Sequence, residues 1–126
     1  MIPIAQTGLL ILLSLFLLLH LGILLKIIPY RAVWGGRLKS DAQMYRFEMV
    51  SLLLNLLFIG LILVKANYLE ISIPKKIITY SFWFMAALFL LNTLGNAVSK
   101  NKLEKRLFTP VTLLLAFFSI ILALAN

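Results

Sequence analysis

The sequence predicts an all-α integral membrane protein, a four-helix bundle of transmembrane helices that forms a single domain over residues 1–126. Three observations predict this class. Hydrophobic residues make up 63% of the chain and charged residues only 13%, which is more apolar material than a soluble domain of this size can bury. The apolar residues fall in four runs without Lys, Arg, Asp or Glu, and ~20 helical residues cross a bilayer core. Short basic connectors separate the runs, which are Ile2–Leu25, Met49–Val64, Ile77–Ser99 and Leu107–Asn126.

We expect the first helix over about residues 3–28, because Pro29 disfavours helical geometry at the preceding residue. The run does not resemble a cleaved signal peptide. Residues 1–6 carry no Lys or Arg, the apolar stretch is longer than an h-region of ~7–15 residues, and no small-residue cleavage motif follows it. We therefore expect this helix to be retained in the membrane.

The second helix is expected over about residues 41–65 and the third over about residues 74–99. Ser40 and Gln43 fit a capping box, in which each side chain bonds a backbone N–H near the helix start. Asp41 in the first turn suits the positive end of the helix dipole. Pro74 is tolerated in a first helical turn, and an aromatic cluster follows it, as expected near a membrane interface.

The fourth helix has two possible starts. Asn101-Lys102-Leu103-Glu104 resembles a cap with an acidic third position, whereas Thr109-Pro110 resembles a cap followed by proline at the first helical position. A helix from Pro110 to the end of the chain would rise only ~25 Å, slightly short of the bilayer core. We favour the earlier start, giving a helix over about residues 102–125 with a kink at Pro110.

The distribution of basic residues predicts the orientation. Nine of the twelve Lys and Arg residues lie in the first and third connector regions, and neither terminus carries any. The positive-inside rule therefore puts these two connectors in the cytoplasm and both termini outside. The same residues are candidates for contact with anionic lipid headgroups at the cytoplasmic face. They are Arg31, Arg37, Lys39, Arg46, Lys100, Lys102, Lys105 and Arg106.

Several classes of function are disfavoured. The net charge of +8 flanks the apolar spans and does not line a soluble face, so we expect no nucleic-acid partner. The chain has no Cys, which excludes disulfides and thiol catalysis, and its one His cannot form a histidine metal site alone. We expect no metal and no cofactor. The absence of Cys and the small size are typical of a bacterial inner membrane protein.

Polar residues inside the spans concentrate in the half that we expect to face the cytoplasm. On the second and third helices they recur three or four residues apart and so share one face, and those of the fourth helix lie close to one face. Because polar side chains facing lipid are costly, the four stripes should face one another and form a pocket open to the cytoplasm. The candidate pocket residues are His20, Glu48, Ser51, Asn55, Asn92, Asn96 and Thr112.

A structural interpretation of these residues stays open. Asn, Ser and Thr often serve only as packing contacts between membrane helices, worth roughly 0.6 kcal/mol each. Glu48 could pair with a basic residue at the headgroup level, and His20 could donate to a backbone carbonyl. An ionisable residue inside a membrane is nevertheless a functional hypothesis by default, and these two are the candidates below the headgroups.

Three functions are compatible with the sequence. The first is a transporter or channel-like protein for a small solute or ion, with His20 titrating near neutral pH. The second is a non-catalytic accessory subunit that binds a larger membrane protein or lipid. The third, and weakest, is a lipid-modifying enzyme that uses His20 and Glu48 as an acid–base pair. A homo-oligomer is possible in each case, and an enzyme is the less favoured class.

Overall fold

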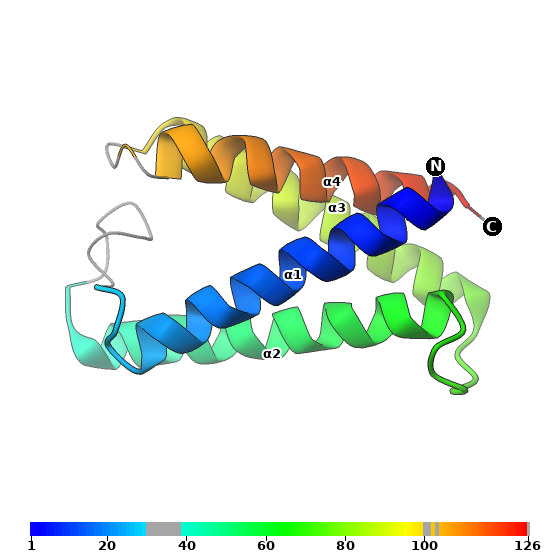
Figure 1. The fold of residues 1–126 in the computed structure, drawn as a ribbon, viewed down its shortest axis with the longest axis horizontal. Helices are drawn as coiled ribbons and strands as arrows, with labels where there is room; N and C mark the ends of the chain where they lie inside the picture. Colours follow the sequence, from blue (N-terminus) through cyan, green and yellow to red (C-terminus); the bar gives the residue numbers. More distant parts are fainter. Residues whose placement is uncertain (30–38, 100–101, 103, 126) are drawn as a thin grey trace.

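The four predicted helices are all present and form an all-α bundle (Figure 1). The computed structural model describes residues 1–29, 39–99, 102 and 104–125. The helices are α1 (Ile2–Leu24), α2 (Asp41–Lys65), α3 (Lys75–Ala97) and α4 (Thr109–Leu124), the last preceded by a π-helical turn at Glu104–Phe108. Each of the four is long and apolar enough to cross a membrane, α4 together with residues of the preceding turn. This confirms the predicted class, a small integral membrane protein.

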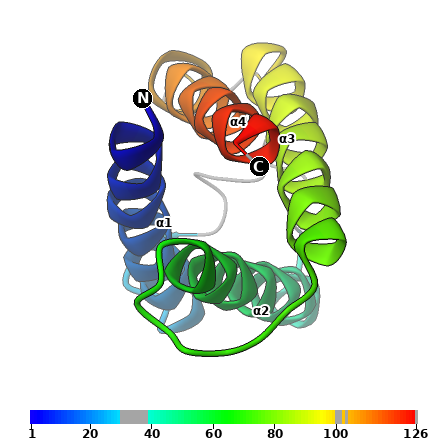
Figure 2. The same cartoon turned by 90° about the vertical axis from the view of Figure 1, so that its right-hand side faces the viewer.

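The helices are arranged as two pairs that converge at one end of the molecule and diverge at the other. α3 packs mainly on α4, and α1 packs on α2 and almost as extensively on α4, while α2 and α3 contact each other little. Both termini and the α2–α3 connector lie at the end that we call the terminal end (Figures 1 and 2). α1 ends and α2 begins at the opposite end, where the chain also passes from α3 to α4. We call this the basic end.

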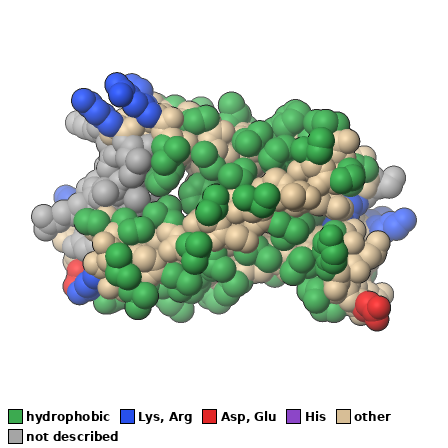
Figure 3. All heavy atoms as spheres, in the orientation of Figure 1, with side chains coloured by type: hydrophobic (Ala, Val, Ile, Leu, Met, Phe, Trp, Pro, Cys, Tyr) green, Lys and Arg blue, Asp and Glu red, His purple; other side chains and the backbone are tan. Residues whose placement is uncertain are grey.

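The outer surface fits a bilayer. Lys, Arg, Asp and Glu side chains lie toward the two ends of the long axis, and hydrophobic side chains cover the band between them (Figure 3). Many large apolar side chains in this band are exposed, including Leu18 and Leu91 at 64% and 66%. Such exposure is unfavourable in water but expected in lipid.

The half of the bundle near the terminal end is tightly packed. Its buried core contains Leu9, Phe82 and Leu122, which are all 0% exposed, and draws on all four helices. Gly8 lets α1 approach α4 closely, since a Cβ atom there would stand 2.4 Å from the ring of Phe118. The Lys65 ammonium also donates a hydrogen bond to the Ala125 carbonyl (2.6 Å), which ties the end of α2 to the end of α4.

α1 ends at Leu24, four residues earlier than we predicted from Pro29. Lys26 takes a left-handed conformation (φ 61°) and its N–H donates to the Ile23 carbonyl, while the Ile27 N–H donates to the Gly22 carbonyl. These two bonds form a Schellman motif. Lysine occupies the position where glycine is usual, so the sequence carries no strong stop there.

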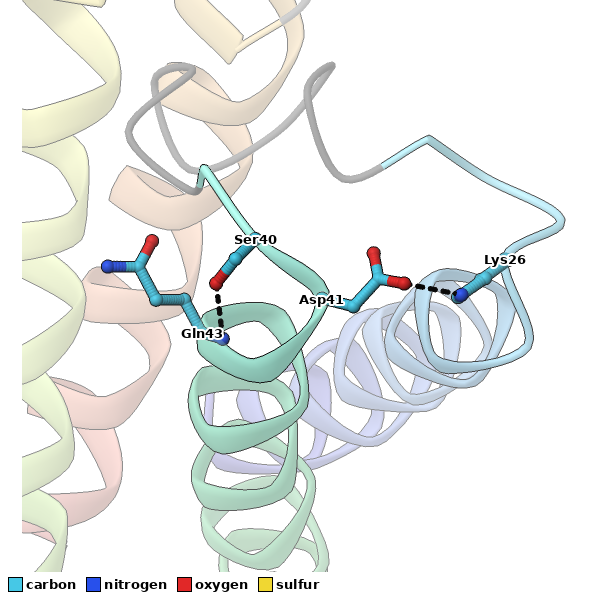
Figure 4. A network of polar contacts seen from close by, with 4 residues as sticks. All are labelled: Lys26, Ser40, Asp41 and Gln43. Atoms are coloured by element: carbon cyan, nitrogen blue, oxygen red, sulfur yellow. Dashed lines mark hydrogen bonds and ion pairs between the residues drawn. The ribbon is translucent and has the colours of Figure 1, made fainter.

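The start of α2 agrees with the predicted capping residues (Figure 4). The Ser40 hydroxyl accepts a hydrogen bond from the Gln43 N–H (3.2 Å), and the Gln43 side chain accepts one from the Lys39 N–H (2.9 Å), one residue before the cap. Asp41 also pairs with Lys26 at 2.6 Å, linking the start of α2 to the end of α1. The hydrogen bond and charge of Asp41 raise the pKa of Lys26.

The start of the fourth helix combines both of the sequence expectations. Helical structure includes Lys102, and the π-helical turn at Glu104–Phe108 leads directly into α4, so the helix begins before Pro110, as we favoured. The distortion takes the form of this wider turn just ahead of the proline. Pro110 itself stands in the first turn of α4, where its missing N–H costs least.

Candidate ligand cavity between the helix pairs

A cavity of about 420 Å³ lies between the two helix pairs, in the half of the bundle near the basic end. This volume lies within the range of small-molecule sites, roughly 300–1,000 Å³. All four helices line the cavity. The structure brings all seven residues of the predicted polar pocket to its wall, namely His20, Glu48, Ser51, Asn55, Asn92, Asn96 and Thr112.

His20 of α1 and Glu48 of α2 form a direct pair, with 2.6 Å between Nδ1 and Oε2. The Glu48 side chain is 0% exposed, whereas that of His20 is 17% exposed. A carboxylate is an acceptor, so Nδ1 carries the proton and donates it to Glu48. The pairing fixes the tautomer and leaves Nε2 as the ring atom that can meet a ligand, a water molecule or a proton.

Asn55 of α2 stands one turn beyond Ser51 on the same cavity-facing side. Its side chain is 5% exposed, and its Oδ1 atom is buried without a hydrogen-bond partner among the described residues. A buried acceptor left unsatisfied costs about 1–3 kcal/mol. Asn55 lines the cavity, but its Oδ1 atom is buried behind the wall and does not face the open space.

Thr112 and Asn96 have a more structural role. The Thr112 hydroxyl lies 2.9 Å from that of Thr93 and 3.4 Å from the Asn96 amide nitrogen, so these three residues link α3 to α4. Thr112 also donates to the Phe108 carbonyl in the π-helical turn (2.8 Å). Thr93 is not among the predicted pocket residues, although it stands three residues before Asn96 and therefore shares its helix face.

Aromatic side chains form much of the apolar wall, and the sequence analysis missed them. Each stands three or four residues from one of the predicted polar residues, which is the spacing that shares a helix face. Phe16 and Phe108 also close the seam between α1 and α4, where their rings meet edge to face at 5.8 Å. The wall residues are Phe16, Phe47, Phe58, Phe89 and Phe108.

The predicted headgroup contacts are only partly within the structure. Arg31, Arg37 and Lys100 lie outside the described residues. The five others are exposed, and none of them lines the cavity. Contact with anionic headgroups stays a prediction for Lys39, Arg46, Lys102, Lys105 and Arg106.

The cavity can therefore offer a ligand apolar and aromatic surface together with a few hydrogen-bonding groups. Within the part of the chain that the structure describes, no group of three His, Asp or Glu residues is placed to hold a metal ion. Comparison with known protein families, characterised proteins and solved structures gave no match. The site must be interpreted from its own chemistry.

Proposed function

We propose that this protein is a transporter or channel-like protein that binds a small solute in the cavity and carries it across a bacterial inner membrane. The basic end is the cytoplasmic end in this proposal, and both termini face outward. The positive-inside rule supports that orientation, because the basic end gathers the first and third connector regions.

The observation that carries the proposal is the cavity of about 420 Å³ inside a membrane bundle, with buried Glu48 and buried Asn55 among its lining residues. Inside a membrane, unsatisfied polar groups are costly because lipid offers no hydrogen bonds. Helix packing alone does not explain why several polar side chains line a cavity of this size. A bound solute or its water would give them hydrogen-bond partners.

The bundle is also tightly packed at one of its two ends only. Apolar packing fills the half near the terminal end, while the half near the basic end holds the cavity. A carrier in an inward-open state has this asymmetry. For transport, the layer around Leu9, Phe82 and Leu122 must separate in a second state that opens toward the outside.

The alternatives predict a different behaviour for this layer. An accessory subunit or a lipid-binding protein has no need to open it. A lipid-modifying enzyme needs both members of an acid–base pair to reach the substrate, yet Glu48 is 0% exposed. Access to the cavity from both sides of the membrane therefore separates transport from the other functions.

The absence of native Cys makes that access measurable. Ser51→Cys places a thiol on the cavity wall, and a membrane-impermeant, cationic methanethiosulfonate reagent can be added to either face of oriented vesicles. We expect modification from both faces, faster from the cytoplasmic face. Ala42→Cys and Ser72→Cys report the orientation, since they lie at the basic end and in the α2–α3 connector.

The control variant is Ser14→Cys, which lies on the exposed surface of α1 and faces lipid, so its thiol should stay unmodified. Modification of Ser51→Cys from the cytoplasmic face alone would show a pocket that does not open outward. That result would overturn transport and favour the accessory role. Rapid labelling of Ala42→Cys from outside would reverse the orientation.

A further inference from the structure

We propose that the cavity takes its ligand from the bilayer, through the opening between α2 and α3, and that the ligand is an amphipathic molecule with an uncharged or cationic head that donates hydrogen bonds. This inference rests on the cavity being a binding site, as the proposed function also does. It adds the route and the chemical class.

The route follows from the exposure of the cavity's rim. Val50 of α2 and Leu91 of α3 line the cavity, yet they are 57% and 66% exposed. Gly95 is exposed in the same rim, and a Cβ atom there would have no neighbour within 4 Å. The seam between α1 and α4 is instead closed by the rings of Phe16 and Phe108. The open side of the cavity therefore faces the lipid between α2 and α3.

Asn92 strengthens this interpretation. It lines the cavity and is exposed at the opening, five residues before the apolar span ends at Ala97. An amide exposed at this depth in a bilayer has no lipid tail to bond with, so it favours a polar group that lies in the opening. Ser51 and Asn96, both half-buried, continue the polar path inward from the rim.

The cavity's charge selects the head of the ligand. Among the described residues that line it, Glu48 is an acid and none is Lys or Arg. His20 Nε2 is an acceptor while the ring is neutral, and the exposed Asn92 amide at the rim offers a carbonyl acceptor. An anionic head, such as a phosphate or carboxylate, would meet a like charge without a compensating cation. An amine or a hydroxyl can donate a hydrogen bond to these acceptors.

The walls select the rest of the ligand. Phenylalanine rings flank the polar groups on several sides, and aromatic faces attract both apolar chains and ammonium groups. A volume of about 420 Å³ holds a polar head and the first part of an alkyl chain. The remainder of the chain can stay in the bilayer, because the opening is lateral.

Three photoactivatable probes with the same alkyl tail test the inference. They carry a primary amine, a hydroxyl or a carboxylate as the head, with a diazirine on the tail close to it. The full-length protein in phosphatidylcholine nanodiscs is irradiated with each probe, and the modified peptides are mapped by mass spectrometry. We expect the amine and alcohol probes to label the inner parts of α2 and α3, roughly fivefold more than the carboxylate probe.

Two glycines provide a matched pair of variants. Gly95→Leu fills the opening and should reduce labelling by the amine and alcohol probes roughly fivefold. Gly60→Leu adds the same side chain to α2, away from the cavity and also without a clash, and should leave labelling unchanged. Asn92→Leu provides a second variant that alters polarity without narrowing the opening as much. It should reduce amine and alcohol labelling but not carboxylate labelling.

Each other outcome overturns a part of the inference. Equal labelling by the three probes would contradict the head chemistry, and unchanged labelling of Gly95→Leu would contradict the route. Absence of labelling, with disulfide-linked dimers of Leu91→Cys, would show that a second copy covers the opening. Labelling as expected with one-sided access at Ser51→Cys would keep the ligand and reject transport. Two-sided access without labelling would reject the ligand and keep transport.

Discussion

The two halves of this bundle are held together by different forces. In the half near the terminal end, side chains from all four helices interdigitate, and several large residues are completely buried. In the half near the basic end, the helix pairs diverge around the cavity, and polar contacts hold each pair together. His20–Glu48 and Lys26–Asp41 link α1 to α2, and Thr93–Thr112 links α3 to α4. Van der Waals packing and interhelical hydrogen bonds are the two main attractions between helices in lipid. Polar contacts have the larger share in the half near the basic end, where a small apolar cluster around Ile23 and Met44 also packs.

In the half near the basic end, we expect the His20–Glu48 pair to be the contact whose loss costs most stability. We expect His20→Ala to destabilise the protein by about 3 kcal/mol, because it removes the hydrogen-bond partner of a fully buried carboxylate. The measurement is reversible unfolding in mixed micelles. The double variant His20→Ala/Glu48→Gln should recover more than half of the loss, since it removes the charge as well.

No recovery in the double variant would mean that the loss comes from packing and not from charge. The two halves would then be stabilised in the same way. Glu48→Gln alone retains an acceptor for the histidine and should cost less than His20→Ala. A larger cost for Glu48→Gln would contradict the assignment of Nδ1 as the donor.

The second prediction tests the packing of the half near the terminal end. Phe82→Ala should cost about 2–3 kcal/mol, because the side chain is 0% exposed and its removal leaves a cavity. Phe16→Ala is the matched change beside the existing cavity, where Phe16 is only half-buried. It should cost roughly half as much. Equal losses of stability in the same unfolding measurement would show that the half near the basic end is packed as tightly as the half near the terminal end.

The third prediction has the opposite sign. Asn55→Leu replaces a buried side chain whose Oδ1 is unpaired by an apolar one of similar size. We expect a gain of about 1 kcal/mol in stability, together with loss of amphiphile labelling. A gain in stability without loss of labelling would assign Asn55 no part in binding. A loss of stability would indicate that Oδ1 has a partner in the membrane, such as ordered water.

The fold was predictable because the bilayer imposes simple rules. Apolar length and the Ser40 cap each act locally, so they can be recognised in single segments of the sequence. The predicted end of α1 was too late because the helix stops through a left-handed backbone conformation at Lys26. Residues other than glycine seldom adopt that conformation. Asn67, at the end of α2, takes the same conformation, and asparagine is a more recognisable residue for it.

The polar residues that line the cavity could be predicted from the sequence, but the shape of the cavity could not. Spacing of three and four residues identifies which side chains share a helix face, and lipid forces such faces together. The same spacing would have found the five phenylalanines, which looked like ordinary apolar residues. The width of the cavity, and the opening between α2 and α3, depend on how the helix pairs cross, and no local pattern encodes that angle.

The fourth prediction concerns the start of α2, which positions Glu48. Ser40→Ala should cost about 1 kcal/mol, because the hydroxyl accepts from the Gln43 N–H. Ala42→Ser, just inside the helix, is the control and should cost clearly less. Equal losses in unfolding would show that the cap contributes little, and that tertiary packing alone fixes the first turn.

The smallest expected effect concerns Lys26, which is exposed and outside the spans. Asp41 raises its pKa, first by a hydrogen bond and then by charge. A raised pKa in the folded state means that the stabilisation is fully present below the ordinary value of 10.5 and is lost as the pH rises through the folded-state pKa. Lys26→Gln should therefore lower the melting temperature slightly at pH 7, and the difference from wild type should shrink at pH values above 10.5.

High salt should also shrink this melting-temperature difference, because exposed ion pairs are screened. Lys39→Gln, at the same end, is the control for general charge effects. A melting-temperature difference that persists at alkaline pH would mean that the alkyl chain of Lys26, and not its charge, joins α1 to α2 at the basic end.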